Sequence, residues 1–137
     1  MSEFQNPTNS EIDEILKNSK RIAVVGMSSK PERASHGVSK RLIARGYEVI
    51  PVNPTEAEVL GLKSYASLGE VPGQIDIVDV FRRSDQTDPI IDEAIAIKAK
   101  VLWLQEDVIN DSGANRAKQA GLQVIQDRCI AKELMRL

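Results

Sequence analysis

The chain contains 137 residues, of which 28% are charged and 42% are hydrophobic, and its formal net charge is -2 at pH 7. This length predicts one domain spanning residues 1–137, and the negative net charge excludes a general attraction to nucleic acid or to an anionic membrane. No apolar run approaches the ~18 residues of a membrane-spanning helix. The single cysteine cannot form an internal disulfide and the N-terminus lacks a signal pattern, so we expect a cytoplasmic protein.

The first predicted element is a short helix. Residues 1–10 are polar, and we expect them to form a mobile leader. Apolar residues then recur at helical spacing from Ile12 to Leu16. Ser10 and Asp13 have the spacing of a capping box. The segment that follows the leader is therefore predicted to be helical.

Strands and helices alternate along the rest of the chain. Residues 21–26 form a β-branched, apolar run typical of a strand that is buried on both faces. The helix after it is expected to begin with Ser35 as its N-cap and to close at Gly46. Four more strands are predicted from the apolar runs at residues 47–52, 75–81, 101–104 and 122–126.

Three more helices are expected between or after these strands. One begins at Asp88 and Pro89, a favourable helix start, and runs to about Ala99. Another spans residues 111–120, and a short terminal helix follows Cys129. A helical turn is also possible in the loop between the second and third strands.

This alternation predicts an α/β fold. Nearly all-apolar strands separated by helices indicate a parallel sheet with helices on both faces. Right-handed crossovers then give a Rossmann-like, doubly wound, five-stranded sheet in three layers, α/β/α, with the expected strand order 3-2-1-4-5. Ligands of such sheets bind at the carboxyl ends of the strands, near the switch point between strands 1 and 4.

Basic residues cluster after the predicted strands, so we expect them on one rim of the sheet. This placement predicts an anionic ligand, although solvated surface cations are the alternative for any one of them. Five on one rim favour binding. The five are Lys30, Arg33, Arg82, Arg83 and Arg128.

The loop after the first strand has the composition of a phosphate-binding loop. Gly26 lets the backbone approach a phosphate closely, or else simply permits a tight turn. Ser28, Ser29 and Ser35 offer hydroxyl groups, and the next helix presents its N-terminal amides. This loop is the first part of the candidate site.

Two features that the sequence lacks, a known nucleotide-binding motif and a carboxylate after the second strand, narrow the type of phosphate ligand. The loop has no G-K-[ST] of a P-loop and matches G-x-G-x-x-G poorly. The second strand ends in Asn53 and Pro54, where a typical NAD site places Asp or Glu on the ribose. A carboxylate there would repel the 3′-phosphate of coenzyme A (CoA). CoA is therefore favoured over NAD, with NADP as the open alternative.

Five blocks of sequence carry a family resemblance. They are RIAVVGMSSKPERAS, GYEVIPVNP, IDIVDVFRRSD, AKVLWLQEDVIN and AGLQVIQDRCI. Over residues 12–133 the chain resembles the small stand-alone CoA-binding domain proteins, which look like the N-terminal domain of the succinyl-CoA synthetase α subunit. The resemblance implies a partner of small-molecule class, CoA or an acyl-CoA.

The resemblance also implies site residues. The phosphates would lie beside the first loop, the adenosine beside the end of the second strand, and the rest of the ligand beside the third and fourth strands. With Ser35 from the loop composition, the expected cofactor-binding residues are Gly26, Ser28, Ser29, Lys30, Arg33, Ser35, Val52, Asn53, Pro54, Val80, Phe81, Arg82, Arg83, Leu104 and Gln105.

The chain departs from these relatives at two points. The synthetase carries its phosphorylated histidine on a second domain, for which this chain has no room, so its catalysis does not carry over. Glu106 and Asp107 follow WLQ, where the small family has an apolar or small pair. Two carboxylates would weaken binding of an anion if they faced it.

Few residues are candidates for catalysis. His36, the only histidine, could hydrogen-bond a phosphate or be a partly exposed residue without a role. Cys129 could exchange with the CoA thiol or be a small buried hydrophobe. Asp76 and Asp79 have no evident acid–base partner. We therefore expect a noncatalytic binding module with no metal site, and keep two alternatives: an NAD(P)-binding redox sensor or small oxidoreductase, and a protein scaffold.

Overall fold

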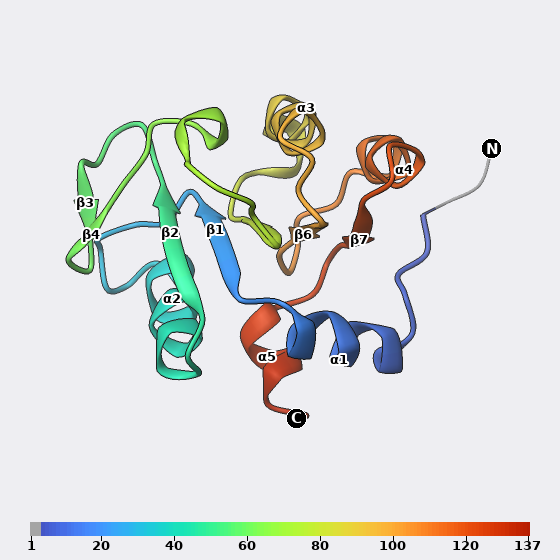
Figure 1. The fold of residues 1–137 in the computed structure, drawn as a ribbon, viewed down its shortest axis with the longest axis horizontal. Coiled ribbons are helices and arrows are strands. Elements are labelled where there is room, and N and C mark those ends of the chain that lie inside the picture. Colours follow the sequence, from blue (N-terminus) through green and yellow to red (C-terminus); the bar gives the residue numbers. More distant parts are fainter. Residues whose placement is uncertain (1–3) are drawn as a thin grey trace.

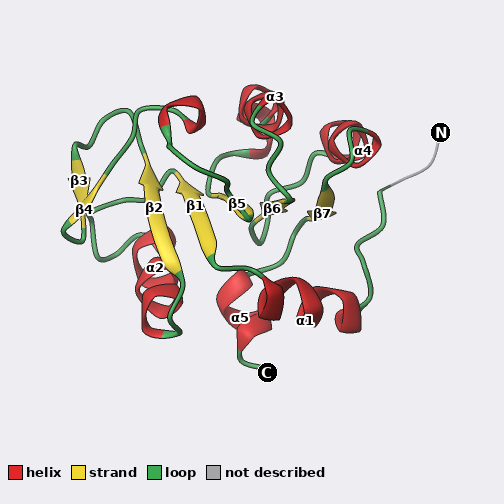
Figure 2. Cartoon of the chain, viewed as in Figure 1, coloured by secondary structure: helices red, strands yellow, loops and turns green. Residues whose placement is uncertain are grey.

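Five parallel strands form the central sheet of the computed structural model, which describes residues 4–137. The predicted three-layer α/β fold is confirmed (Figure 1, Figure 2). The strands are β1 (Arg21–Val25), β2 (Glu48–Val52), β5 (Ile77–Val80), β6 (Val101–Leu104) and β7 (Gln123–Ile125). One face carries α1 (Asn9–Asn18), α2 (Ala34–Ala44) and α5 (Ile130–Leu134), and the other carries α3 (Asp88–Ala96) and α4 (Asp111–Gln119).

The strand order is β2-β1-β5-β6-β7, or 2-1-3-4-5 along the chain, so the predicted order 3-2-1-4-5 is wrong. Pro51 supplies the physical reason. Its carbonyl accepts a hydrogen bond from the N–H of Tyr65 on the outer side of β2 (3.0 Å). The N and C=O groups of one residue point to the same side of a strand, so the missing N–H of Pro51 also faces outward. A proline in this orientation suits an edge strand, and β5 pairs with β1 instead.

The connection from β2 to β5 contains elements that periodicity does not reveal. A small antiparallel hairpin joins β3 (Glu58–Val59) to β4 (Leu62–Lys63). The turn expected in this connection is the 3-10 helix η1 (Leu68–Glu70), and a second one, η2 (Ser84–Gln86), follows β5. Figure 1 shows the connection passing over the face of the sheet that carries α3. The connection therefore brings β5 to the side of β1 that is opposite β2.

Two predicted helix starts are each wrong by two residues. Thr8, not Ser10, is the N-cap of α1, and it forms the capping box with Glu11. Arg33, not Ser35, is the N-cap residue of α2 and makes no side-chain cap, and the Ser35 hydroxyl accepts instead from the Ser28 N–H. The start of α3 at Asp88 with Pro89 in its first turn is confirmed.

The expected leader is packed where the structure describes it. Phe4 packs against the core on the face of α3 and α4. The Asn6 amide donates to the Gln126 carbonyl and the Gln126 N–H donates to Asn6 Oδ1, each at 2.8 Å. These contacts contradict free motion of the segment from Phe4 onward, and residues 1–3 of the expected leader lie outside the described residues.

Both faces of the sheet are buried. One cluster lies under α3 and α4 and includes Val80 and Leu104. The other lies under α1, α2 and α5 around Trp103, which is fully buried and donates from Nε1 to the Arg128 carbonyl at 2.8 Å. No helix within residues 4–137 is long and apolar enough to span a membrane. The two clusters cover the faces of the sheet, so the polar loops meet at the ends of the strands.

Candidate functional site

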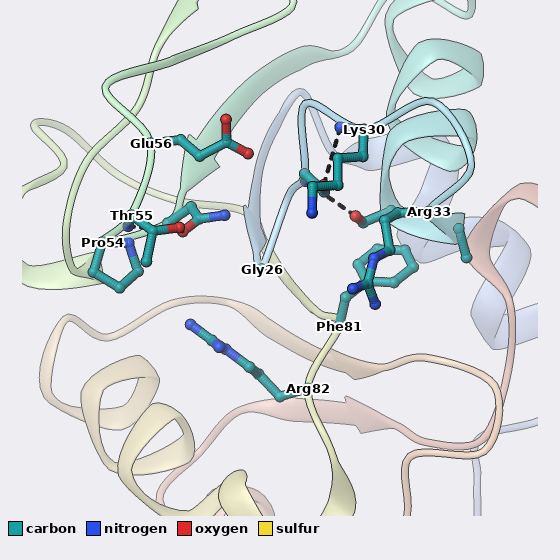
Figure 3. Close-up of a pocket in the computed structure, with 12 residues that line it drawn as sticks. Gly26, Lys30, Arg33, Pro54, Thr55, Glu56, Phe81 and Arg82 are labelled. Carbon is teal, nitrogen blue, oxygen red and sulfur yellow. Dashed lines mark hydrogen bonds between the residues drawn. The ribbon is translucent and has the colours of Figure 1, made fainter.

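A cavity of about 480 Å³ opens at the carboxyl ends of β1, β2 and β5, where the strand order reverses. Figure 3 shows the three loops that surround it. This is the expected rim of the sheet, although the switch point lies between β1 and β5 rather than between the first and fourth strands. The lining residues are Gly26, Ser28, Lys30, Arg33, Ala34, Ser35, Asn53, Pro54, Thr55, Glu56, Phe81 and Arg82.

Gly26 lies where β1 leaves the sheet, between the ends of its two neighbours. Its N–H donates to the Val52 carbonyl at 2.8 Å, and the N–H of Phe81 donates to the Val25 carbonyl at 2.9 Å. The φ of Gly26 is +85°, and a Cβ added there would collide with the Phe81 backbone oxygen. Glycine is required here by both conformation and space.

Buried polar groups hold the loop after β1 in place. The Ser35 hydroxyl accepts from the Ser28 N–H at 3.1 Å. His36 is only 8% exposed, and its Nδ1 lies 2.9 Å from the Ser28 carbonyl, to which it donates. The Asn53 amide donates to the Met27 carbonyl at 2.9 Å. His36 is therefore a buried loop anchor, which contradicts the alternative of a partly exposed residue without a role.

Three cations of this cavity have no acidic partner. Among residues 4–137, no carboxylate lies within 4 Å of the charged groups of Lys30, Arg33 or Arg82, and in Figure 3 their side chains are arranged around Gly26. The other two predicted rim cations differ. Arg83 bonds Asp85 at 2.9 Å, and Arg128 bonds Glu133 at 3.5 Å.

Glu56 is the one carboxylate among the residues that line this cavity. Its Oε2 accepts a hydrogen bond from the Ser29 N–H at 2.8 Å. Hydrogen bonding from Ser29 lowers the pKa of the Glu56 carboxyl against the opposing effect of burial, and the charge of Lys30 adds a lesser lowering. The sequence argument missed Glu56 because it examined only the residues directly after β2.

A second hollow of about 640 Å³ adjoins the first. The residues Arg33, Ala34, Phe81 and Arg82 line both, so the two spaces meet there. The second hollow continues past the ends of β5 and β6. Its other lining residues are Val38, Arg83, Gln86, Gln105, Glu106, Asp107, Val108 and Cys129.

The two acidic residues after β6 do face this second hollow, and one of them is neutralised. Glu106 accepts from the Lys132 ammonium at 3.0 and 3.1 Å, and this hydrogen bond raises the pKa of Lys132. Asp107 has a φ of 69°, and its N–H donates to Asp127 at 2.8 Å. Their effect on an anion is therefore weaker than two free carboxylates would exert.

A buried carboxyl is hydrogen-bonded to Gln105, which lines the second hollow. Asp79 is fully buried in β5 between Val24 and Trp103. Burial raises its pKa to about 7, against the opposing effect of the hydrogen bond from Gln105 Nε2 to Asp79 Oδ1 at 2.6 Å. The other oxygen, Oδ2, has no hydrogen-bond partner.

The structure brings most of the predicted site residues together. Eleven of the fifteen line one or both spaces, with Arg83 and Gln105 in the second only. Ser29 is exposed and contributes its N–H to Glu56. The side chains of three predicted residues instead lie in the core, at 0–3% exposure, because they belong to strands rather than to loops: Val52, Val80 and Leu104. Arg33, Phe81 and Arg82 line both spaces.

The family follows from a comparison with known proteins. Residues 20–135 match the family model described as a CoA binding domain. The chain belongs to this family. The CoA-binding domain family accounts for the resemblance seen in the five sequence blocks, and nothing in the comparisons favours the NADP alternative.

Three relatives illustrate the range of this family. Uncharacterized protein YneT of Bacillus subtilis is 51% identical over 127 residues, 93% of this chain and 94% of that one. A hypothetical protein from Pyrococcus horikoshii OT3 has a solved structure with TM-score 0.93 and 41% identity, covering 100% of this chain and 99% of that chain. The α subunit of ADP-forming acetate–CoA ligase II from Pyrococcus furiosus is 43% identical over 61 residues, 44% of this chain and 13% of the subunit.

Proposed function

We propose that this protein binds CoA or an acyl-CoA without catalysing a reaction on its own. The phosphates of the ligand lie in the 480 Å³ cavity, with the loop after β1 on one side and Arg82 on the other. The observation that carries the proposal is the set of three cations, Lys30, Arg33 and Arg82, that lack acidic partners at the edge of a CoA-binding domain. A bound polyphosphate supplies the negative charge that balances these three cations.

The same geometry supports the noncatalytic part of the proposal. A general base needs a pKa near the working pH and reach of the substrate. Glu56, the carboxylate of the first cavity, has a lowered pKa, and the ring of His36 is directed at the Ser28 carbonyl. Neither group is placed to move a proton on a bound ligand, so the cavity supports binding and positioning.

Ligand titrations test this function. CoA, acetyl-CoA, dephospho-CoA, NAD and NADPH are added to the purified protein, and binding is measured by calorimetry and by the shift in thermal unfolding. A ligand at 100 times its dissociation constant stabilises the folded state by about 2.7 kcal/mol. We expect CoA and acetyl-CoA to give the largest shifts. A larger shift with NAD or NADPH would refute the assignment, and turnover of acetyl-CoA by the protein alone would refute its noncatalytic part.

A further inference from the structure

The 640 Å³ hollow leads from the proposed phosphate cavity to the only cysteine of the chain. Arg33, Phe81 and Arg82 stand where the two spaces join, and Cys129 lines the second space but not the first. The cysteine is half-buried and forms no disulfide. CoA is a linear molecule with its phosphates at one end and a thiol at the end of its pantetheine arm. A ligand held by its phosphates therefore has a path that ends at Cys129.

The walls of this hollow suit a pantetheine arm. Val38, Phe81 and Val108 contribute apolar surface. Gln105 is only 3% exposed, and its Nε2 is used by Asp79. No described residue donates a hydrogen bond to its Oε1, and this oxygen is not among the buried unpartnered atoms of residues 4–137, so it is accessible to a ligand. Pantetheine contains two amide N–H groups, either of which can donate to this oxygen.

The surroundings of Cys129 favour a lasting adduct. The chain has one cysteine, so no second thiol of the same molecule can attack a disulfide formed there. Disulfide exchange requires a thiolate and access to the disulfide sulfur. Glu106, one of the two acidic residues that line the hollow, is neutralised by Lys132. A mixed disulfide at this position would persist until an external thiol removed it.

We propose that Cys129 takes CoA from CoA disulfides by thiol–disulfide exchange and holds it as a mixed disulfide. The Cys129 thiolate attacks the CoA sulfur of CoA–S–S–R, a bond forms between the two sulfurs, and R–S⁻ leaves and takes up the proton that Cys129 lost. The disulfide substrate is the oxidant, so no other is required. This inference rests on the proposed binding of CoA, because binding of the phosphates is what aims the disulfide at Cys129.

Intact-mass measurement under non-reducing conditions tests the exchange. The reduced protein is incubated with the symmetrical CoA disulfide, or with pantethine, which has the same disulfide without phosphates or adenosine. We expect one adduct, heavier by one CoA less two hydrogen atoms and removed by dithiothreitol. CoA disulfide should react at least about tenfold faster than pantethine at equal concentration, because binding raises the effective concentration of the sulfur at Cys129.

Variants separate this proposal from simple binding. Cys129→Ser should form no adduct, with its folding verified by circular dichroism. Arg82→Ala should lose the rate advantage of CoA disulfide, whereas Lys118→Ala, which removes an exposed cation on α4, should keep it. Equal rates with CoA disulfide and pantethine would overturn the proposal.

Two further outcomes would also overturn the exchange. One is the absence of any adduct in a protein that still binds CoA by calorimetry under reducing conditions, which would leave the proposed function intact. The other is transfer of the acetyl group from acetyl-CoA to Cys129 in place of exchange with CoA disulfide. A protein that binds no CoA at all would refute the proposed function itself.

Discussion

The two ends of the central sheet carry similar charges and use them differently. At the amino end, Arg21 pairs with Glu48 at 3.2 Å, and Lys100 pairs with Asp76 at 3.6 Å. Asp76 also accepts the N–H groups of Lys20 and Arg21, each at 2.9 Å. At the carboxyl end, the cations that line the first cavity have no such partners within the described chain.

This difference separates charge that stabilises the fold from charge that is available to a ligand. A paired cation gains little from a new anion, because its partner must be displaced or must share it. An unpaired cation beside others is repelled by them until an anion arrives. The cations at the amino end of the sheet are thus balanced by acidic groups of the chain, whereas those of the first cavity are balanced by a ligand.

The largest contrast between the two ends is expected at their glycines. Gly26→Ala places a methyl group against the Phe81 backbone at positive φ, whereas Gly46, which precedes β2 at the amino end, has a φ of +94° and open space around its Cβ position. Gly46→Ala should cost about 1–2 kcal/mol from backbone conformation. Gly26→Ala should cost about 2–5 kcal/mol, since overpacking adds about 1–3 kcal/mol.

Denaturant unfolding of both variants measures these costs, and calorimetry at a temperature where each is folded measures CoA binding. We expect Gly26→Ala to lose binding as well as stability, and Gly46→Ala to keep its affinity. Equal destabilisation of the two variants would mean that the close approach of Gly26, after β1, to Phe81, after β5, adds nothing to the cost of Gly26→Ala.

Adjacent arginines provide the second test. Arg82 lines the first cavity without an acidic partner, whereas the Arg83 side chain is 75% exposed and paired with Asp85. A charge-assisted hydrogen bond contributes about 1.5–3 kcal/mol, so Arg82→Ala should weaken CoA binding roughly 10- to 100-fold. Arg83→Ala should change it less than about threefold, as expected for an exposed pair worth under 1 kcal/mol. Calorimetry at fixed salt decides, and the reverse ranking would exclude Arg82 as the phosphate contact.

These two arginines also show where sequence reasoning ends. The position of both after the third strand predicted that they lie on the rim, and they do. Their difference depends on Asp85, two residues further on, turning back to bond Arg83 at 2.9 Å. Spacing along a loop does not specify such a turn, so the sequence could identify the cluster of cations but not the member that is free.

Pro51 and Glu56 mark two other limits. The alternation of apolar runs sufficed for the fold class, because parallel strands need both faces covered. The edge position of β2 is marked by Pro51, a single residue whose missing N–H cannot donate to a further strand on the outer side of β2. Glu56 reaches the cavity only because Asn53 folds the chain back, accepting from the Thr55 N–H at 2.9 Å. Both features depend on local hydrogen bonds rather than on periodicity.

Asp76, directly before β5, and Asp79, within β5, allow the contrast between the two ends of the sheet to be tested by pH. At the amino end, burial acts to raise the pKa of Asp76, but the N–H groups of Arg21 and Lys20 and the charge of Lys100 outweigh it and lower the pKa. Toward the carboxyl end, burial raises the pKa of Asp79 to about 7. Asp76 therefore stabilises the fold above its unfolded pKa of 3.8, and this contribution is lost as the pH falls through the lower pKa of the folded state.

Asp79 should have the opposite effect. Between pH 3.8 and about 7 the folded state holds a proton on Asp79 that the unfolded state has released. Its contribution to stability therefore falls as the pH rises through this window, by at most about 1.4 kcal/mol per pH unit, and is constant above it. Asp79→Asn should remove this pH dependence. The free energy of unfolding of the variant, relative to that of the original chain, should be highest above pH 8. Urea unfolding from pH 4 to 9 measures it, and an unchanged slope in the variant would contradict the raised pKa.

The smallest effect is expected at Glu56, the single acid of the first cavity. Its carboxylate braces the loop through the Ser29 N–H, and its charge opposes that of a phosphate nearby. Glu56→Gln keeps an oxygen to accept this hydrogen bond and removes the charge. Exposed charges interact weakly because solvent screens them, so CoA should bind only about two- to fivefold more tightly.

Glu58→Gln is the matched control, because Glu58 is exposed on β3 and does not line the cavity. Calorimetry at low and high salt compares the three proteins, and the gain of Glu56→Gln should shrink as salt screens the charges. Weaker binding by Glu56→Gln would instead assign the carboxylate a direct contact with a ligand hydroxyl. The carboxyl end of the sheet would then recognise its ligand by an acid as well as by its unpaired cations, which would narrow the contrast with the amino end.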